Sequence, residues 1–235
     1  MFLSLLCVPF AGSGAGFYRS WPKRGEGSPQ VVPLQLPGRE ERFLDAPWTD
    51  ALEAATDLAR SALRMVDGTG PVALFGHSIG AVLAYETARK LQAQGFEQLQ
   101  HLFVSGSPGP WSGRTERATG LDDDSFVARV AEFAGYRHSA LDDPDLREVL
   151  LPLLRADVAL HENYKPVSDE PLTVPVTALR GVDDTLVSRA QCEEWAAVTS
   201  GPFGMTELPG GHMYLIGNEQ RVLDVIDAAV EAAHT

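Results

Sequence analysis

A serine flanked by glycines is the first candidate for chemistry, because residues 76–80 read Gly-His-Ser-Ile-Gly. An apolar run at residues 72–75 comes directly before this motif, and a helical pattern at residues 79–94 follows it. This order of strand, tight turn and helix is typical of a nucleophile elbow, in which small neighbours allow close backbone approach and the serine oxygen projects at a helix N-terminus. Ser78 is therefore predicted to be a nucleophile.

A serine hydroxyl is a weak nucleophile at neutral pH, so it needs a histidine as base and an acid that orients the imidazole. The chain has six histidines. His212, in the sequence Gly-Gly-His-Met, follows the last predicted strand and precedes the last predicted helix, where the base of such a triad belongs. We interpret the other five as surface or packing residues: His77, which lies inside the elbow, and His101, His138, His161 and His234.

The candidate acids follow the predicted strand at residues 174–180, in the sequence Gly-Val-Asp-Asp-Thr-Leu-Val. The spacing Gly-x-x-Asp-x-x-Val favours Asp184 as the acid of the triad. Asp183 is predicted to cap the turn by accepting backbone hydrogen bonds. Residues 105–109, at the end of the preceding predicted strand, contain no carboxylate, which excludes an acid from that position.

Acyl transfer to serine also requires an oxyanion hole of two backbone N–H groups, each worth about 3–4 kcal/mol in the transition state. Ile79, the residue after the serine, is predicted to supply one of them. The second is predicted to come from the small-residue loop at residues 10–14, with Ala11 as the donor.

The same loop faintly resembles a dinucleotide-binding turn, because residues 12–16 read Gly-Ser-Gly-Ala-Gly. However, Phe17 stands in the place of the third glycine, and residues 36–39 offer no acidic group for a ribose. The Lys-Ser/Thr pair of a Walker loop is also missing. We therefore expect no cofactor, and the cysteine and acidic residues show no metal-binding spacing.

Short apolar runs alternate with longer amphipathic patterns along the chain, which predicts an α/β fold with a mostly parallel sheet and helices on both faces. The predicted strands are residues 2–8, 31–36, 72–75, 101–105, 174–180 and 203–208. The predicted helices are residues 49–65, 79–94 and 218–233. Thr49 and Asn218 are the expected N-caps, and Gly95 is the expected C′ glycine.

Residues 108–171 interrupt this alternation with two further helical patterns, at residues 124–134 and 145–161, the second broken near Pro152. A helical insert between strands of an α/β sheet covers the carboxyl ends of the strands, where ligands bind. We therefore predict one domain over residues 1–235 with a helical lid at about 108–171. A purely structural excursion is the alternative.

Composition excludes several classes of function. A net charge of −13, with no cluster of Lys and Arg, argues against binding to nucleic acids or anionic membrane surfaces. No apolar run approaches the roughly 18 residues of a membrane span, and the N-terminal run lacks the basic region of a signal peptide. Cys7 and Cys192 are two isolated thiols, which favours a reducing compartment, and we expect a cytoplasmic protein.

Five motifs occur in order between about residue 3 and residue 230. They are Pro-Phe-Ala-Gly at 9–12, Leu-Pro-Gly-Arg-Glu at 36–40, the elbow at 76–81, Leu-Leu-Arg-Ala-Asp at 153–157 and Gly-Gly-His-Met-Tyr-Leu at 210–215. Together they resemble the type II thioesterases, which are α/β-hydrolases and stand-alone editing partners of polyketide synthases and nonribosomal peptide synthetases. Ser13 departs from the pattern, since the family commonly has a second glycine there.

The resemblance implies a thioesterase that clears stalled or mis-primed acyl or aminoacyl groups from the phosphopantetheine arms of acyl or peptidyl carrier proteins. It also agrees with an acid after the later strand, as at Asp184. Carrier domains are often acidic, so we expect weak, local recognition by a monomeric enzyme. Phe126, Phe133 and Leu150 are hypothesised to shape the acyl channel, and the alternative is that they only pack the lid.

Three other readings stay open at this point. A general carboxylesterase or a small lipase would use the same triad on oxygen esters, and an acyltransferase would pass the acyl group to an alcohol or amine. A non-catalytic binding module would have no need of the serine. Oxygen-ester substrates, product analysis and a Ser78→Ala variant separate these possibilities.

Overall fold

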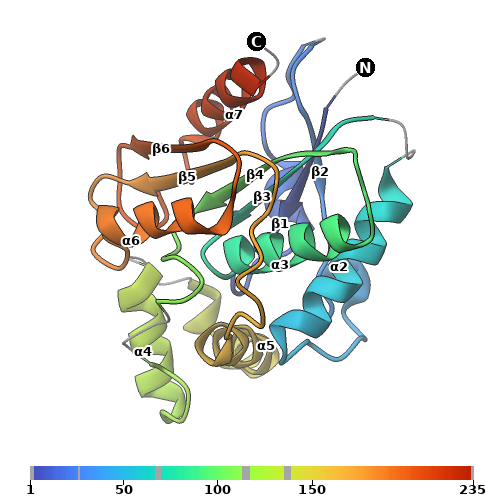
Figure 1. Ribbon diagram of the computed structural model, residues 1–235. Coiled ribbons are helices and arrows are strands. Elements are labelled where there is room, and N and C mark those ends of the chain that lie inside the picture. The colour runs from blue at the N-terminus through green and yellow to red at the C-terminus, as the bar shows by residue number, and fades with distance from the viewer. Residues whose placement is uncertain (1–2, 26, 67–69, 113–116, 135–138, 234–235) are drawn as a thin grey trace.

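The computed structural model describes residues 3–25, 27–66, 70–112, 117–134 and 139–233. Six strands form one sheet in the order β2-β1-β3-β4-β5-β6, and every neighbouring pair is parallel (Figure 1). The strands are β1 (Ser4–Val8), β2 (Gln30–Pro33), β3 (Val72–His77), β4 (Leu99–Ser105), β5 (Val176–Gly181) and β6 (Phe203–Leu208). The predicted α/β fold is confirmed.

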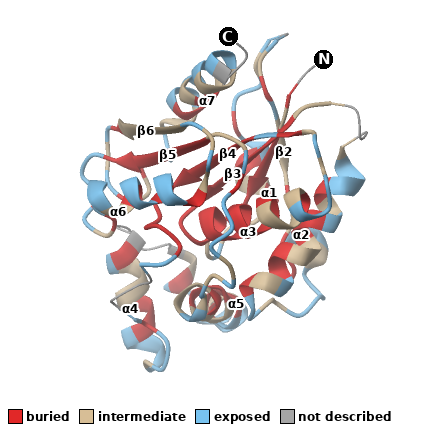
Figure 2. Cartoon of the chain, in the orientation of Figure 1, coloured by how far each residue is buried: buried red, intermediate tan, exposed pale blue. Residues whose placement is uncertain are grey.

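Helices cover both faces of the sheet. One face packs against α2 (Ala51–Met65), α3 (Ile79–Ala93), α6 (Arg189–Glu193) and the 3-10 helix η3 (Glu194–Val198), and the other against α1 (Ala15–Arg19) and α7 (Glu219–Ala233). Strands β3 and β5 are buried at every position, as expected for strands covered on both faces (Figure 2). The edge strands β2 and β6 are only partly buried.

The strand order reverses at β1, which lies between β2 and β3. In open α/β sheets, ligands bind outside the carboxyl ends of the strands at such a point. The end of β1 is in register with the end of β3, since Val8 pairs with Gly76. The loop that follows Val8 and the turn that contains Ser78 therefore leave the sheet side by side.

The ends of the helices correct one prediction and confirm another. Asp50, and not Thr49, caps α2, because its carboxylate accepts hydrogen bonds from the N–H groups of Leu52 and Glu53. Gly95 ends α3 at a φ of 72°, and the N–H groups of Gly95 and Phe96 bond back to the last turn, as predicted for a C′ glycine.

The chain between β4 and β5 contains α4 (Asp123–Ala134), a 3-10 turn η2 (Ser139–Leu141) and α5 (Pro144–Asn163). The predicted break at Pro152 is wrong: α5 continues through the proline for 20 residues. Leu151, Leu153 and Leu154, on both sides of Pro152, are buried, and this packing outweighs the loss of one backbone hydrogen bond.

Helices α4 and α5 share a hydrophobic cluster of their own, distinct from the two clusters on the faces of the sheet. Ion pairs join the two helices, with Arg155 2.6 Å from Asp123 and Arg147 2.7 Å from Asp124. The guanidinium of Arg155 also lies 4.3 Å from the centre of the Phe126 ring. The insert thus has its own packing, although its role as a lid stays a prediction.

Within the described ranges, no helix is long and apolar enough to cross a membrane. The same part of the chain contains no group of three or more His, Cys, Asp or Glu placed to hold a metal ion. Cys7 and Cys192 are buried thiols that form no disulfide.

Candidate active site

Ser78 lies at the junction of β3 and α3, where the sequence places it. Its backbone has φ 54° and ψ −122°, a strained conformation for a residue other than glycine, and its N–H donates to the carbonyl of Ser105 at 2.8 Å. A Cβ atom on Gly76 would lie 1.9 Å from the carbonyl oxygen of Gly80, and one on Gly80 would lie 2.6 Å from that of Val8. The turn therefore requires both glycines.

His212, in the loop after β6, is paired with Asp184, in the loop after β5. Their atoms Nδ1 and Oδ2 are 2.9 Å apart, and both side chains are buried. Burial raises the pKa of the Asp184 carboxyl, but the hydrogen bond and charge of His212 and the N–H groups of Val187 and Leu186 outweigh it and lower the pKa below its usual value. Asp184 is thus held as a carboxylate beside the imidazole.

The second oxygen of Asp184 forms the turn. Oδ1 accepts from the N–H of Leu186 at 2.8 Å and from that of Val187 at 3.0 Å. These are the backbone contacts predicted for Asp183, which is instead exposed, so that prediction is wrong. Arg180, buried at the end of β5, fixes the same loop by donating to the carbonyls of Asp184 and Val187.

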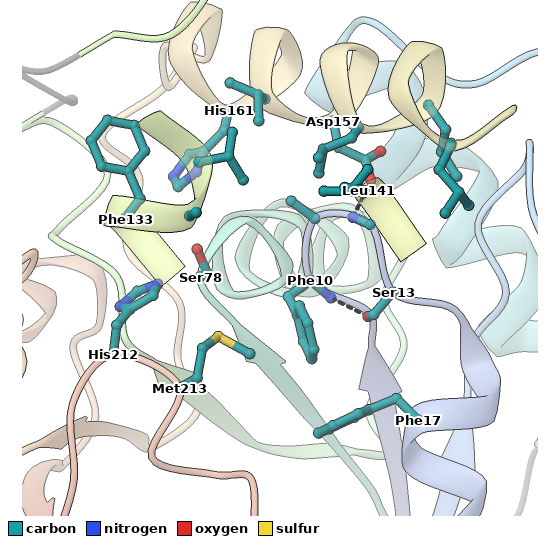
Figure 3. Close-up of a pocket in the computed structure, with 18 of the residues that line it drawn as sticks. Phe10, Ser13, Phe17, Ser78, Phe133, Leu141, Asp157, His161, His212 and Met213 are labelled. Carbon is teal, nitrogen blue, oxygen red and sulfur yellow. Dashed lines mark hydrogen bonds between the residues drawn. The ribbon is translucent and has the colours of Figure 1, made fainter. Parts of the chain in front are cut away.

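Ser78 and His212 both face one cavity of about 420 Å³ beneath the insert (Figure 3). Its walls are mainly apolar and come from the insert helices and from the loops at the sheet edge. The insert contributes Phe133, Leu150, Leu153, Leu154 and Val158, and the sheet edge contributes Phe10, Phe17, Met213 and Ile216. Phe126 is not among the lining residues, so for this residue the alternative of packing the lid holds.

Of the predicted oxyanion donors, Ala11 lines the same cavity as Ser78, and Ile79 follows the serine in the chain. Ile79 is the first residue of α3, a position whose N–H has no acceptor within its own helix. Ala11 lies in the turn after β1, where Phe10 and Ser13 bond to each other at 3.0 and 3.1 Å. The N–H of Ala11 makes no hydrogen bond within the part of the chain that the structure describes.

The remaining five histidines fall into four groups. His77 is buried under the site, with Nδ1 2.8 Å from Ser105 Oγ and its ring 5.0 Å from that of His212. His101 is a packing residue that stacks on a neighbouring ring. His161 lines the cavity, which sequence reasoning missed, although it continues the α5 stripe of Leu154 and Val158 at helical spacing. His138 and His234 lie outside the described residues.

A serine at an elbow, a histidine–carboxylate pair and two nearby N–H groups form an arrangement suited to nucleophilic acyl transfer. The predicted residues Ser78, Asp184 and His212 come from three different loops, yet all lie at the carboxyl edge of the sheet. The apolar cavity beside them offers room for the acyl part of a substrate.

Comparison with known proteins identifies the family. Residues 4–230 match the family model of the thioesterase domain. The chain is 35% identical over 229 residues to a probable cadicidin biosynthesis thioesterase of Streptomyces griseus, and it spans 97% of its own length but 62% of that protein.

Solved structures give the same result over nearly complete chains. The type II thioesterase BorB of the borrelidin biosynthetic cluster has a TM-score of 0.85 and 33% identity, covering 98% of this chain and 93% of BorB. YbtT, a type II thioesterase of the yersiniabactin NRPS/PKS pathway, has a TM-score of 0.89 and 28% identity, covering 100% and 94%. The chain therefore belongs to the thioesterase family of α/β-hydrolases, as a serine hydrolase of the type II group from nonribosomal peptide and polyketide pathways.

Proposed function

We propose that this protein acts as a stand-alone editing enzyme, which hydrolyses acyl or aminoacyl thioesters on the phosphopantetheine arms of carrier proteins. One observation carries the proposal: the serine at the elbow and the buried histidine–aspartate pair open onto one apolar cavity. Removal of stalled or aberrant acyl groups is the activity that such a site supports best.

Ser78, His212 and Asp184 are the proposed catalytic residues. His212 takes the proton of the Ser78 hydroxyl, whose oxygen attacks the thioester carbonyl, while Asp184 holds the imidazole with Nδ1–H directed at its carboxylate. The negative oxygen of the tetrahedral intermediate accepts hydrogen bonds from the backbone N–H groups of Ala11 and Ile79. The carbon–sulfur bond then breaks and leaves an acyl ester on Ser78.

Deacylation uses the same groups. A thiolate is a stable leaving group that needs little protonation, so His212 acts mainly as a base. After its imidazolium has passed the serine proton to the departed thiolate, neutral His212 accepts a proton from water, whose oxygen attacks the serine ester. His212 then gives this proton to the Ser78 oxygen as the acid product leaves. The reaction needs neither a metal nor a bound cofactor beyond the phosphopantetheine of the substrate itself.

The insert at about residues 108–171 is proposed to act as the lid of a single domain. Helices α4 and α5 supply much of the apolar wall over Ser78, and their separate packing cluster gives them the integrity to move as a unit. The acyl chain enters under this wall. The carrier, an acyl or peptidyl carrier protein, would be recognised at the rim through short-range contacts, because both partners are acidic.

The protein is further proposed to act as a monomer in the cytoplasm. Both cysteine thiols are buried and unpaired, which fits a reducing compartment. Burial also raises the pKa of the Cys192 thiol to about 12, so this residue is not a competing nucleophile at neutral pH.

The test compares an acyl-phosphopantetheine carrier protein with a matched oxygen ester of the same acyl group, for the wild type and for Ser78→Ala. Hydrolysis that prefers the carrier thioester and disappears with Ser78→Ala is the expected result. Turnover of oxygen esters alone would instead identify a general esterase. Transfer of the acyl group to an added amine or alcohol, with no free acid formed, would identify an acyltransferase.

A further inference from the structure

A buried ion pair joins the insert to the segment between β2 and α2. Arg39 and Asp157 are bonded twice, with Nη1 2.9 Å from Oδ2 and Nη2 2.7 Å from Oδ1. Their side chains are 7% and 8% exposed, which distinguishes this pair from the solvent-exposed pairs between α4 and α5. Asp157 belongs to α5, whereas Arg39 lies between β2 and α2, 118 residues earlier.

The same two side chains hold the loop that contains Ala11. Oδ2 of Asp157 accepts the N–H of Gly12 at 2.8 Å, and Nη1 of Arg39 donates to the carbonyl of Ser13 at 2.8 Å. In Figure 3, Asp157 points from α5 toward the loop of Phe10 and Ser13. Asp157, as an acceptor, thus fixes the direction of the Gly12 N–H, and Arg39, as a donor, fixes that of the Ser13 carbonyl.

Steric contacts reinforce this junction. Gly12 has a φ of 73°, and a Cβ atom placed on it would lie 3.2 Å from Cδ1 of Leu154, one turn from Asp157 on α5. A Cβ on Gly38, next to Arg39, would lie 3.0 Å from Cδ1 of Leu153. The loop, the Arg39 segment and α5 therefore meet without room for further side-chain atoms.

From this geometry we propose that the Arg39–Asp157 pair is a positioning element that couples the seating of the lid to the oxyanion hole. With α5 seated, Asp157 holds the peptide after Ala11, and the N–H of Ala11 is directed at the developing oxyanion. When α5 moves away, Gly12 loses its acceptor and the donor loses its fixed direction. This inference rests on the proposed function, in which Ala11 is an oxyanion donor.

The consequence is a link between substrate loading and catalysis. An open lid would admit the arm of the carrier while leaving the oxyanion hole incomplete, and closure over the acyl chain would complete it. A substrate whose acyl chain does not allow the lid to close would then react slowly. Asp157 and Arg39 touch the loop and not the reacting atoms, so both are positioning residues.

The experiment measures kcat and KM for Asp157→Ala and Arg39→Lys on a carrier-bound acyl thioester. Removal of one oxyanion donor lowers kcat by about 100- to 1,000-fold, so a misdirected donor is expected to cost about 10- to 100-fold, with KM changed less than about threefold. Arg39→Lys keeps the charge but loses the bidentate geometry, and it should retain more activity than Asp157→Ala.

Two inhibitors separate an oxyanion effect from a loosened lid. A trifluoromethyl ketone analogue of the acyl chain forms a tetrahedral oxyanion with the serine, whereas a thioether analogue lacks the carbonyl. We expect Asp157→Ala to weaken the ketone in parallel with kcat and to leave the thioether affinity unchanged. Equal weakening of both analogues would mean that the pair only holds the lid, and would overturn the proposal.

Tyr164→Phe is the matched control. The hydroxyl of Tyr164, at the end of α5, donates to Glu86 on α3 at 2.6 Å, so it also fastens the lid to the core but does not touch the loop. Its kcat should stay near the wild-type value. If Asp157→Ala keeps the wild-type kcat while Ser78→Ala loses turnover, the proposed coupling between the lid and the oxyanion hole is rejected but the proposed function is not. Undiminished turnover in Ser78→Ala would reject the proposed function itself.

Discussion

Asp184 and His212 share one hydrogen bond, from Nδ1 to Oδ2, and this leaves the other carboxylate oxygen of Asp184 to hold its own loop. The acid that orients the imidazole is therefore itself oriented by two backbone N–H groups. A carboxylate bonded on both oxygens stays ionised and cannot rotate away from the histidine.

This arrangement predicts very different effects for two adjacent aspartates. Asp184→Asn should lower kcat by about 1,000- to 10,000-fold, because an amide cannot accept the Nδ1 proton and hold the loop as well. Asp183→Asn should change kcat less than about twofold, since Asp183 is exposed. Steady-state kinetics on an acyl-pantetheine thioester at pH 7 checks both, with circular dichroism to verify folding. Equal losses in the two variants would contradict the assignment.

The packing of the elbow predicts that even a methyl group at Gly80 is not tolerated. Gly80→Ala brings Cβ to 2.6 Å from the Val8 carbonyl, so β1 or α3 must shift and Ser78 must move with it. We expect a loss of about 1–3 kcal/mol in the free energy of unfolding and at least about a tenfold loss in kcat. Urea unfolding and kinetics measure the two effects. Gly25→Ala, which meets no atom within 4 Å, is the control and should leave both unchanged.

His101 predicts how stability depends on pH. It is buried against Phe103, with Nε2 2.9 Å from Thr177 Oγ1, and burial lowers its pKa from 6.5 to about 4. The unfolded chain binds the proton below about pH 6.5 and the folded chain only near pH 4. The stability due to neutral His101 is thus complete above about pH 6.5 and falls as the pH drops toward 4.

The size of this effect is about 3 kcal/mol over that interval. His101→Gln keeps a partner for Thr177 but does not titrate. When the pH is lowered from 7 to 4.5, the wild type should therefore lose about 2–3 kcal/mol more unfolding free energy than this variant. Urea titrations at several pH values measure the difference. Parallel curves for the two proteins would show that His101 is not the titrating group.

The part of the fold that the sequence predicts is the part encoded locally. The apolar run before Ser78 and the helical pattern after it mark the β3–α3 junction, and Gly95 marks the end of α3. The position of His212 after the last strand follows from the order of elements. Each of these features depends on neighbours in the sequence, where steric and periodic patterns are informative.

What the sequence could not predict depends on distant contacts. Motif spacing favours Asp184 over Asp183 as the acid, but it does not show that the second oxygen of Asp184 also caps the turn, because the direction of the turn after β5 decides which side chain does so. Pro152 remains inside α5 because of leucine packing, which overrides a local rule. The bond between Arg39 and Asp157 joins residues far apart in the chain, and no local pattern indicates it.

The walls of the cavity predict which residues select the acyl chain. Phe133 and Leu150 line the space in front of Ser78, whereas Phe126 is 1% exposed in the core of the insert. Phe133→Ala and Leu150→Ala should therefore admit longer chains. Burial of a methylene is worth about 0.8 kcal/mol, so two further methylenes should raise the ratio of kcat/KM for long over short acyl groups about tenfold.

Phe126→Leu is the matched control for this prediction, since it alters the packing of the insert without touching the cavity. It should lower the free energy of unfolding by about 1 kcal/mol and leave the preference for chain length unchanged. A series of acyl-pantetheine substrates from two to twelve carbons, assayed with all three variants, gives the ratios directly. If the chain-length profile stays that of the wild type in Phe133→Ala and Leu150→Ala, then the insert covers the site without selecting the chain, and selectivity must arise from the rigid loops at the sheet edge.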